Sequence, residues 1–384
     1  MRVGIFSECY KPTINGVVVS IESFREELEK RGHKFFIFTS STQDYREKDP
    51  SHVFRFPSVK TFTKDYPLAI PSFAPFKTDH ILNMGLDLIH SQHMFSMGRL
   101  GLRIARKLNI PIVHTYHTLI SEYTHYIPLF PGLAESSVTR ISRNYCNACD
   151  QVITPSPSMK KILRSYGVSA PIESIPTGVN LEDFKNPYHK ELLRSKWKIP
   201  EHQKILLYLS RVAREKNLDF LFSVVKKLAK KRNDFHLLLV GGGPELDHYQ
   251  DFVHKADLDS RVTFTGMQEK KEANRFFGAA DIFVFPSITE TQGIVITEAM
   301  AAGTPSVAIN KMGPSNIIKN EVNGFLTPLN KKEFSSKIEK LLDDDDLRKK
   351  MGKNAKESAE KFSTKHSADK MEDIYEKMLS YYSR

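Results

Sequence analysis

Two carboxylates stand in a short, strongly patterned segment of the chain, residues 281–305. The segment opens with the apolar run 282–285, which is rich in β-branched and aromatic residues, as buried parallel strands are. Glu290 lies in the polar loop that follows, and Glu298 lies on a helix predicted to run from about 291–293 to Gly303. A strand that feeds a helix in this way places helix N–H groups at the carboxyl edge of a sheet, where phosphate groups bind.

The two glutamates would repel a bare phosphate unless each takes a hydroxyl group as its partner. Glu290 would face the group that hangs from the phosphate, and Glu298 could reach a ribose. This layout therefore suits a nucleotide sugar better than a nucleotide alone. The plainer alternative is an ordinary strand–helix unit with two solvated glutamates.

A basic loop follows another predicted strand, residues 205–209. Arg211 and Lys216 share this loop, and Arg214 is a neighbour. A guanidinium fork together with an ammonium group suits a diphosphate and would neutralise the charge that builds on a leaving phosphate. The alternative is that these side chains are simply solvated.

Glycines and one methionine complete the candidate donor site. Gly16 precedes a helix predicted over 19–31, so a diphosphate or sugar could approach its backbone, although a tight turn would also explain it. Gly243 closes a glycine run after the predicted strand 236–240, and Met267 follows the predicted strand 262–264. The spacing of a dinucleotide fingerprint is missing, so we expect contact with the edge of a donor rather than an NAD site.

His117 lies just past the predicted strand 112–115, where ligands bind in open α/β sheets. An isolated histidine in such a place is usually structural.

Glu290, seven residues, Glu298 and the run Ala-Met-Ala-Ala-Gly-Thr-Pro together resemble the signature of the large retaining E-x7-E glycosyltransferases, the family 4-like group. The resemblance implies an α/β protein with the GT-B architecture, in which two Rossmann-like domains face each other across a cleft. It implies an acceptor-binding domain of residues 1–180 plus 366–384, including a C-terminal helix that crosses back, and a nucleotide-sugar-binding domain of residues 181–365.

The resemblance also implies roles for individual residues. His117, Glu290, Arg211 and Lys216 would be catalytic. The donor would be bound by Gly16, Arg211, Lys216, Gly243, Met267, Glu290, Thr291, Gln292, Gly293, Ile294 and Glu298. The nucleotide sugar is a substrate, and we expect neither a cofactor nor a metal, because Arg, Lys and helix N-termini supply the positive charge.

A narrower resemblance rests on the stretch from Tyr116 to Ile127, with its His-Thr, Glu-Tyr and His-Tyr-Ile groups. It is similar to bacterial diacylglycerol glucosyltransferases and, more distantly, to phosphatidylinositol mannosyltransferases. Gln292 also fits the diacylglycerol branch, whereas Ile120 stands where that branch commonly has tyrosine. The acceptor region would then comprise Tyr116, His117, Tyr123, His125 and Tyr126.

This branch implies transfer of a hexose, as glucose from UDP-glucose, to 1,2-diacylglycerol on the cytoplasmic face of the membrane. The alternatives are a mannosyltransferase acting on phosphatidylinositol, a transferase acting on a soluble acceptor, and a nucleotide-sugar epimerase. A membrane-associated nucleotide-sugar binder without activity is a further alternative.

Length and composition agree with these expectations. The 384 residues suggest two domains, and the net charge of +11 suits an anionic membrane surface or a merely solvated surface. No basic arm, zinc finger or RNA-binding signature points to nucleic acid. The sequence predicts no export signal and no apolar run near the roughly 20 residues of a membrane span, so we expect a cytoplasmic, peripheral protein.

Two further segments have open interpretations. The aromatic and apolar residues of segment 54–77 lie among lysines and an arginine, so the segment could touch a membrane or fold over its domain. Cys146 and Cys149 form a C-x-x-C pair, which we interpret as buried helix thiols rather than as zinc ligands.

Overall fold

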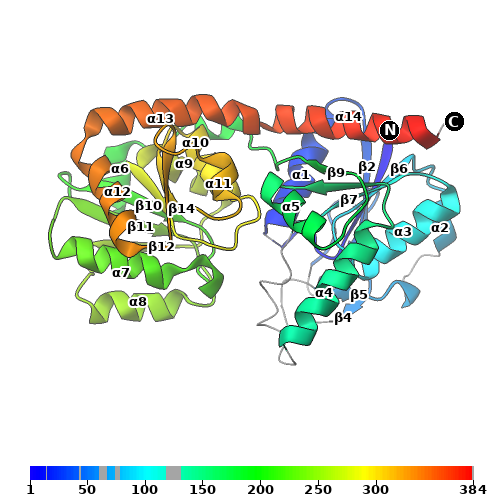
Figure 1. Cartoon of the computed structure of the whole chain (residues 1–384), viewed down its shortest axis with the longest axis horizontal. Coiled ribbons are helices and arrows are strands. Elements are labelled where there is room, and N and C mark those ends of the chain that lie inside the picture. The colour runs from blue at the N-terminus through cyan, green and yellow to red at the C-terminus, as the bar shows by residue number, and fades with distance from the viewer. Residues whose placement is uncertain (14, 43–44, 60–66, 74–77, 118–130, 383–384) are drawn as a thin grey trace. The chain divides into compact units, whose positions relative to one another are not determined.

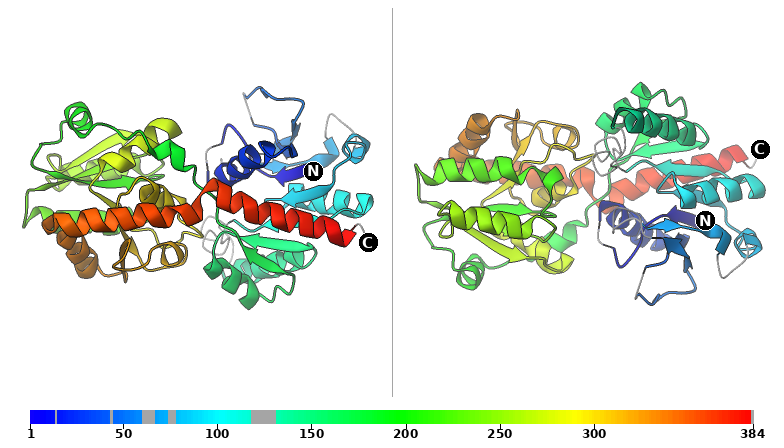
Figure 2. Two further views of the ribbon diagram at one scale, coloured as in Figure 1. Left: turned by 90° about the horizontal axis from the view of Figure 1, so that it is seen from above. Right: turned by 90° about the horizontal axis from the view of Figure 1, so that it is seen from below.

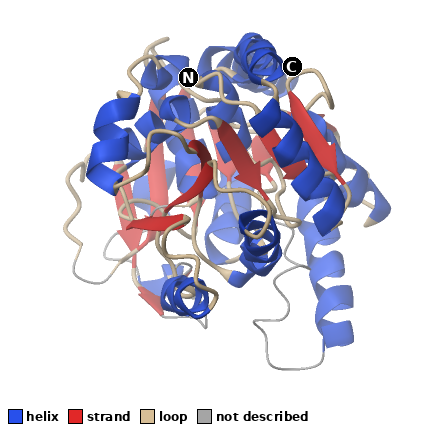
Figure 3. Ribbon diagram, turned by 90° about the vertical axis from the view of Figure 1, so that its left-hand side faces the viewer, coloured by secondary structure: helices blue, strands red, loops and turns tan. Residues whose placement is uncertain are grey.

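The computed structural model describes residues 1–13, 15–42, 45–59, 67–73, 78–117 and 131–382 (Figure 1). The chain forms two compact units. Unit 1 comprises Met1–Gly178 together with Thr364–Arg384, and unit 2 comprises Val179–Ser363. Each unit is built on one parallel sheet whose strands lie between helices (Figure 3). The α/β class and the return of the last helix to the N-terminal unit are thereby confirmed.

Unit 1 contains a seven-stranded sheet in which every neighbouring pair is parallel. The strands, in their spatial order, are β3 (Val53–Phe56), β2 (Lys34–Ser40), β1 (Arg2–Ser7), β6 (Leu88–Ser91), β7 (Ile112–Thr115), β8 (Gln151–Thr154) and β9 (Ile172–Ser174). Their residues are almost all buried, because helices cover both faces of the sheet.

The helices of unit 1 are α1 (Gly16–Glu29), α2 (Thr78–Leu82), α3 (Ser96–Leu108), α4 (Pro131–Cys146), α5 (Pro157–Ser165) and α14 (Thr364–Tyr382), with a short 3-10 turn, η1 (Pro71–Phe73). A small antiparallel pair joins β4 (Ser58–Val59) to β5 (Leu68–Ala69). Figure 2 shows α14, in red, over the sheet on the side that α1 also covers. Glu372 fixes this helix to the start of the chain by pairing with Arg31 and with His33, each at 2.6 Å.

Unit 2 contains a six-stranded parallel sheet. Its strands, in spatial order, are β12 (Val262–Gly266), β11 (Phe235–Val240), β10 (Lys204–Leu209), β13 (Ile282–Phe285), β14 (Ser306–Ile309) and β15 (Gly324–Thr327). Its helices are α6 (Lys190–Trp197), α7 (Leu218–Ala229), α8 (Leu246–Lys255), α9 (Lys270–Ala279), α10 (Ile294–Ala301), α11 (Pro314–Ile317), α12 (Lys331–Asp343) and α13 (Asp345–Ala359), with 3-10 turns η3 (Leu181–Phe184), η4 (Arg214–Lys216) and η5 (Glu360–Phe362).

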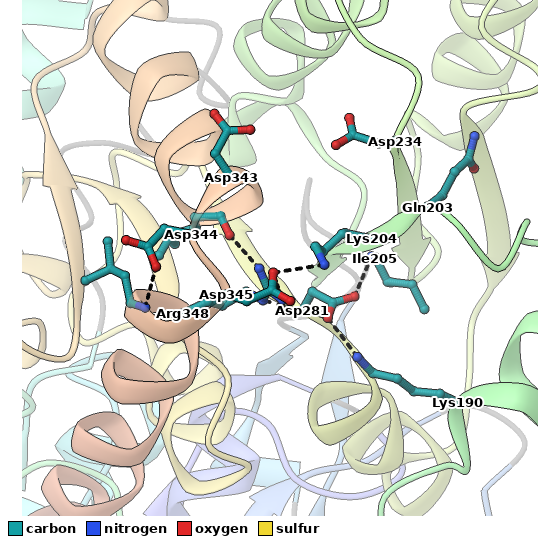
Figure 4. Close-up of polar contacts among 12 residues, drawn as sticks. Lys190, Gln203, Lys204, Ile205, Asp234, Asp281, Asp343, Asp344, Asp345 and Arg348 are labelled. Carbon is teal, nitrogen blue, oxygen red and sulfur yellow. Dashed lines mark hydrogen bonds and ion pairs between the residues drawn. The ribbon is translucent and has the colours of Figure 1, made fainter.

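A buried carboxylate holds the amino edge of this second sheet together (Figure 4). Asp281 accepts a hydrogen bond from the backbone N–H of Ile205 at 2.8 Å and pairs with Lys190 at 2.7 Å. Arg348 of α13 lies 3.9 Å from the same carboxylate and donates to Asp345 at 2.8 Å. These contacts connect α6, α13 and the starts of β10 and β13, at the sheet edge opposite the loops that follow the strands.

Two segments adopt a structure that their sequence does not suggest. An Asn-Gly pair such as 323–324 is typical of a turn, yet Gly324 starts the edge strand β15. A Cβ at this position would lie 2.8 Å from the carbonyl oxygen of Ser306, so the glycine permits close strand packing. The charged segment 341–361 contains no proline, yet it is divided between α12 and α13. Asp344 caps the second helix by accepting from the N–H of Leu347 at 2.8 Å.

The described part of segment 54–77 is only partly covered. Phe56 is buried, and the Phe54 ring stacks on Phe38 with centroids 5.2 Å apart, whereas Val59 and Leu68 are exposed. Residues 60–66 and 74–77 lie outside the described residues. None of the helices that the structure describes is both long enough and apolar enough to cross a bilayer.

Candidate functional site

The candidate donor residues gather at one edge of the unit 2 sheet. Because β12, β11, β10 and β13 are adjacent and parallel, the loops that follow them lie side by side at their carboxyl ends. These loops carry Met267, the run 241–243, the stretch 210–217 and the stretch 286–293, in that order along the edge. The structure therefore places all the predicted donor residues of unit 2 in or beside one row of loops.

The glycine run joins three of these loops by close backbone packing. A Cβ on Gly241 would lie 2.0 Å from the carbonyl oxygen of Ser210, and a Cβ on Gly243 would lie 2.2 Å from that of Val212. The N–H of Val212 donates to the carbonyl oxygen of Gly242 at 2.9 Å, and the N–H of Gly241 donates to the carbonyl oxygen of Gly266 at 3.0 Å. Gly243 is thus required by the packing of the loops, whatever it contacts in a ligand.

The basic loop after β10 is tied to the loop after β13. Lys216 Nζ lies 2.5 Å from Glu290 Oε1, which also accepts from Ser287 Oγ at 3.2 Å. The Asn217 side chain donates to the carbonyl of Pro286 at 3.0 Å. Arg211 is exposed in the same loop. A carboxylate, an ammonium group and a guanidinium group are therefore collected over the ends of two neighbouring strands.

The start of α10 brings the remaining loop residues to this edge. Gly293 caps the helix with a left-handed φ of 88°, which favours glycine. The carbonyl of Glu290 accepts from the N–H of Gly313 at 2.9 Å, which closes the loop against the next one. Gln292 is buried, while Thr291 and Ile294 are partly exposed beside it.

Glu298 lies deeper, on α10, and is 3% exposed. Its Oε1 pairs with Lys270, the first residue of α9, and its Oε2 has no hydrogen-bond partner among the described residues. A buried carboxylate oxygen without a partner is costly, and a ligand hydroxyl would satisfy it. Asp183 of η3 is close enough for the Glu298 charge to act on it, and burial is the main cause that raises the pKa of Asp183.

Met267 follows β12 and is 73% exposed. Its side chain borders Gly242, where a Cβ would meet Met267 Cβ at 3.4 Å. An exposed apolar side chain therefore lies beside a backbone position that carries no side chain.

Gly16 behaves differently from Gly243. It is the first residue of α1, it is exposed, and a Cβ there would meet nothing within 4 Å among the described atoms. Asn15 caps the helix by accepting from the N–H of Val18 at 3.0 Å. Nothing in the described structure of unit 1 requires glycine at position 16.

His117 lies past the end of β7, in unit 1. Its Nε2 lies 2.6 Å from Gln92 Oε1, and because a carbonyl oxygen only accepts, the Nε2–H donates. Burial, with the nearby imidazoles of His93, His90 and His114, lowers the pKa of His117 well below its ordinary value. The ring is therefore neutral near pH 7, with Nδ1 unprotonated.

The other predicted acceptor residues are less informative. Tyr116 is 3% exposed, and its hydroxyl shares a hydrogen bond with Ser142 at 3.0 Å. Its side chain packs in the interior of unit 1. Tyr123, His125 and Tyr126 lie outside the described residues.

Several polar residues were missed by the sequence reasoning. Gln92 follows β6 directly, so its position after a strand could have indicated a site residue. Nothing in the sequence around Lys270 indicates its role, because its partner Glu298 is 28 residues away. Glu8, just past β1, is 2% exposed and accepts from the N–H of Met97 at 2.7 Å. Burial raises the pKa of Glu8, and the residue holds the start of α3.

The thiols Cys146 and Cys149 are both buried, and burial raises the pKa of Cys146 to about 12. Within the described ranges, the structure contains no group of three or more His, Cys, Asp or Glu residues arranged to hold a metal ion.

Comparison with known proteins identifies both halves of the chain. Residues 14–183 match the family described as Glycosyltransferase Family 4, and residues 189–358 match Glycosyl transferases group 1. The chain is 36% identical to the alpha-monoglucosyldiacylglycerol synthase of Streptococcus pneumoniae over 331 residues, which is 85% of this chain and 75% of that protein. It is 28% identical to the enzyme of the same name from Acholeplasma laidlawii over 388 residues, 98% of this chain and 96% of that protein.

The fold comparison agrees. The sucrose-phosphate synthase of Thermosynechococcus elongatus superposes with a TM-score of 0.80 at 22% identity, over 99% of this chain and all of that one. The chain is therefore a glycosyltransferase with the GT-B fold, and it belongs to the family that carries the Glycosyltransferase Family 4 and group 1 glycosyl transferase domains in this order.

Proposed function

We propose that the protein is a retaining glucosyltransferase that moves glucose from UDP-glucose to 1,2-diacylglycerol. The observation that carries the choice of sugar and acceptor is the 36% identity with a protein named alpha-monoglucosyldiacylglycerol synthase, over 85% of this chain. The residues around His117 and Gln292, which are similar to that branch in sequence, support the same choice.

The order of groups along the unit 2 sheet supports a nucleotide-sugar donor. Met267 offers a surface for the base, and the unpartnered oxygen of Glu298 suits a ribose hydroxyl. Arg211 and Lys216 suit the diphosphate, and Glu290 suits the hydroxyls of the sugar. Gly16 and Gly293 would let the phosphates or the sugar approach the backbone.

The reaction then needs little covalent chemistry from the protein. The acceptor oxygen attacks C1 of glucose on the face from which the diphosphate leaves. The bond from C1 to the phosphate oxygen breaks, the new C1–O bond forms, and the acceptor proton passes to the leaving phosphate. Arg211 and Lys216 stabilise the charge on the departing UDP, which is electrostatic catalysis.

His117 acts as a neutral imidazole in this scheme. Its Nε2–H donates to Gln92, so Nδ1 is the ring nitrogen that carries the acceptor lone pair. We expect no metal requirement, because the two cationic side chains and the helix N-terminus supply the positive charge.

The acceptor also implies a place of action. Diacylglycerol resides in a bilayer, and UDP-glucose is a cytoplasmic metabolite, so we place the enzyme peripherally at the cytoplasmic face of the membrane. The net charge of +11 suits an anionic lipid surface.

The test is incubation with radiolabelled UDP-glucose, with and without mixed micelles of diacylglycerol and an anionic lipid. UDP release and label in the organic phase are followed together. Label that enters the lipid only when diacylglycerol is present supports the proposal. Glu290→Gln should lower this transfer about 100-fold or more. Glu357→Gln, an exposed change in the same unit, should leave the transfer unchanged.

Other outcomes select among the alternatives. UDP release without labelled lipid would overturn the lipid acceptor and point to a soluble one. A nucleotide sugar that is altered without UDP release would indicate an epimerase. If UDP is not released and the nucleotide sugar is not altered, the choice of donor is overturned. GDP-mannose with phosphatidylinositol would then be tested.

A further inference from the structure

Two side-chain hydrogen bonds clamp the ends of β6 and β7 in unit 1. His90 Nε2 lies 2.7 Å from Thr115 Oγ1, and Gln92 Oε1 lies 2.6 Å from His117 Nε2. His90 and Gln92 are two residues apart, as are Thr115 and His117. The first bond joins the two strands themselves, and the second joins the residues just past their ends, so both bonds link the same two chain segments.

The C-terminal helix reaches the first of these bonds. The Tyr375 hydroxyl lies 2.6 Å from His90 Nδ1, and the two rings meet edge to face at 5.7 Å. Tyr375 and His90 are 1% and 2% exposed. Both nitrogens of the imidazole are therefore occupied by hydroxyl groups, one from α14 and one from β7.

The protonation state of His90 determines which hydroxyl group donates to the ring and which accepts from it. Burial lowers its pKa to about 3, so the ring is neutral at physiological pH and carries one N–H. One hydroxyl must then donate to the ring while the other accepts from it. A change at Tyr375 therefore alters the hydrogen bond that His90 can offer to Thr115, two residues before His117.

The position of α14 in the chain adds a second observation. Unit 2 ends at Ser363, and α14 begins at the next residue. The chain enters unit 2 at Val179 and leaves it just after Phe362. The N–H of Val179 donates to the carbonyl oxygen of Phe362 at 2.8 Å, so the entry and exit points are joined. The helix that touches His90 is thus covalently continuous with the unit that carries the candidate donor residues.

We propose that Tyr375 is a positioning residue for His117, acting through His90, Thr115 and the paired ends of β6 and β7. The inference rests on the proposed function in one respect, which is that His117 belongs to its reaction site. In this arrangement α14 holds the His117 imidazole in the orientation and tautomer that the reaction uses.

The test compares Tyr375→Phe with Tyr381→Phe, since Tyr381 lies on the same helix and is 56% exposed. Glucosyl transfer is measured at saturating and limiting UDP-glucose, below the melting temperature of each variant. Tyr375→Phe should lower kcat roughly tenfold or more and leave KM for UDP-glucose within about twofold, because a displaced group costs rate rather than donor binding. Tyr381→Phe should change neither.

Thr115→Val is the second variant, because it removes the hydroxyl on the other side of His90. If the two hydroxyls act through one path, Tyr375→Phe combined with Thr115→Val should lose no more activity than the worse single variant. Losses in kcat that multiply would contradict a common path.

A spectroscopic measurement separates this inference from the proposed function. Long-range 1H–15N spectra of the histidines report the tautomer of His117, which a His117→Gln spectrum assigns. Tyr375→Phe should shift or broaden the His117 signals, and Tyr381→Phe should not. Unchanged His117 signals in Tyr375→Phe would overturn the inference even if transfer is observed. Shifted signals in a protein that transfers nothing would support the inference and leave only the proposed reaction in error.

Discussion

Lys216 Nζ and Glu290 Oε1 lie 2.5 Å apart at the carboxyl edge of the unit 2 sheet, and each side chain is 17% exposed. The residues are 74 positions apart in the chain and meet because β10 and β13 are neighbours. In the proposed reaction this pair must separate, since Lys216 turns to the diphosphate and Glu290 to the sugar. The pair therefore holds both groups in place before the donor arrives and competes with it for Lys216.

This competition leads to the first prediction. Glu290→Gln should bind UDP, which lacks the sugar, roughly threefold more tightly than the wild type, because a partly buried ion pair no longer holds Lys216. The same variant should lose about 100-fold or more in kcat. Isothermal titration with UDP and a transfer assay measure the two effects, with Glu357→Gln as the control. Weaker UDP binding by Glu290→Gln would show that the pair does not compete with the phosphate.

The second prediction concerns Lys270, which pairs with Oε1 of the buried Glu298 and leaves Oε2 for a ligand. Wild-type protein should bind 2′-deoxy- or 3′-deoxy-UDP about tenfold more weakly than UDP, the usual scale for a lost hydrogen bond to a charged group. Lys270→Met should weaken UDP binding and shrink that discrimination, because Glu298 is no longer held. Lys271→Met removes the same charge from the neighbouring exposed position and should leave both UDP binding and the discrimination against the deoxy analogues unchanged. Equal behaviour of the two lysine variants would rule out a specific role for Lys270.

The sequence was informative where chemistry depends on the end of a strand. Apolar runs such as 205–209 and 282–285 predicted buried strands, and the residues after them, Arg211 and Glu290, lie at one sheet edge. In a parallel sheet, the position just past a strand implies that edge, so local pattern was enough.

The pairings themselves could not be read from the chain. Lys216 with Glu290, Lys270 with Glu298, and His117 with Gln92 each depend on which strands are neighbours and on how helices pack over them. The same limit applies to Gly324, which looked like a turn residue because its close approach to Ser306 is visible only in three dimensions.

The third prediction contrasts two glycines of the candidate donor site. Gly243→Ala should destabilise unit 2 by about 2 kcal/mol or more, because its Cβ would lie 2.2 Å from the carbonyl oxygen of Val212. Gly16→Ala should change stability by no more than about 1 kcal/mol, because it adds a methyl group in open space at the start of a helix. Thermal melts and KM for UDP-glucose measure the outcome. A rise in KM for Gly16→Ala without a change in melting temperature would mean that the space is needed by the ligand, and an unchanged KM would remove Gly16 from the donor site.

The last prediction is a pH dependence of stability that arises in the interior of unit 1. Burial lowers the pKa of His90 and His93 to about 3 and that of His114 to about 4, against an ordinary value of 6.5. Below pH 6.5 these three imidazoles bind protons in the unfolded chain but remain unprotonated in the folded chain. The stability from these neutral rings is therefore complete above pH 6.5 and is lost as the pH falls toward the folded values, by up to about 1.4 kcal/mol per pH unit for each ring.

Glu8 opposes this trend, because burial raises its pKa, and between its unfolded and folded values the folded state binds the extra proton. The effect of this one carboxyl group is smaller than the combined effect of the three imidazoles, so the free energy of unfolding still rises with pH. Urea unfolding at pH 7.5 and pH 5.5 should therefore give a clearly lower midpoint at pH 5.5. His114→Gln should flatten the dependence, whereas His254→Gln should not, since the side chain of His254 is 82% exposed. Equal midpoints at the two pH values would mean that the buried rings are protonated in the folded protein and that the network from Tyr375 to Thr115 carries a charge.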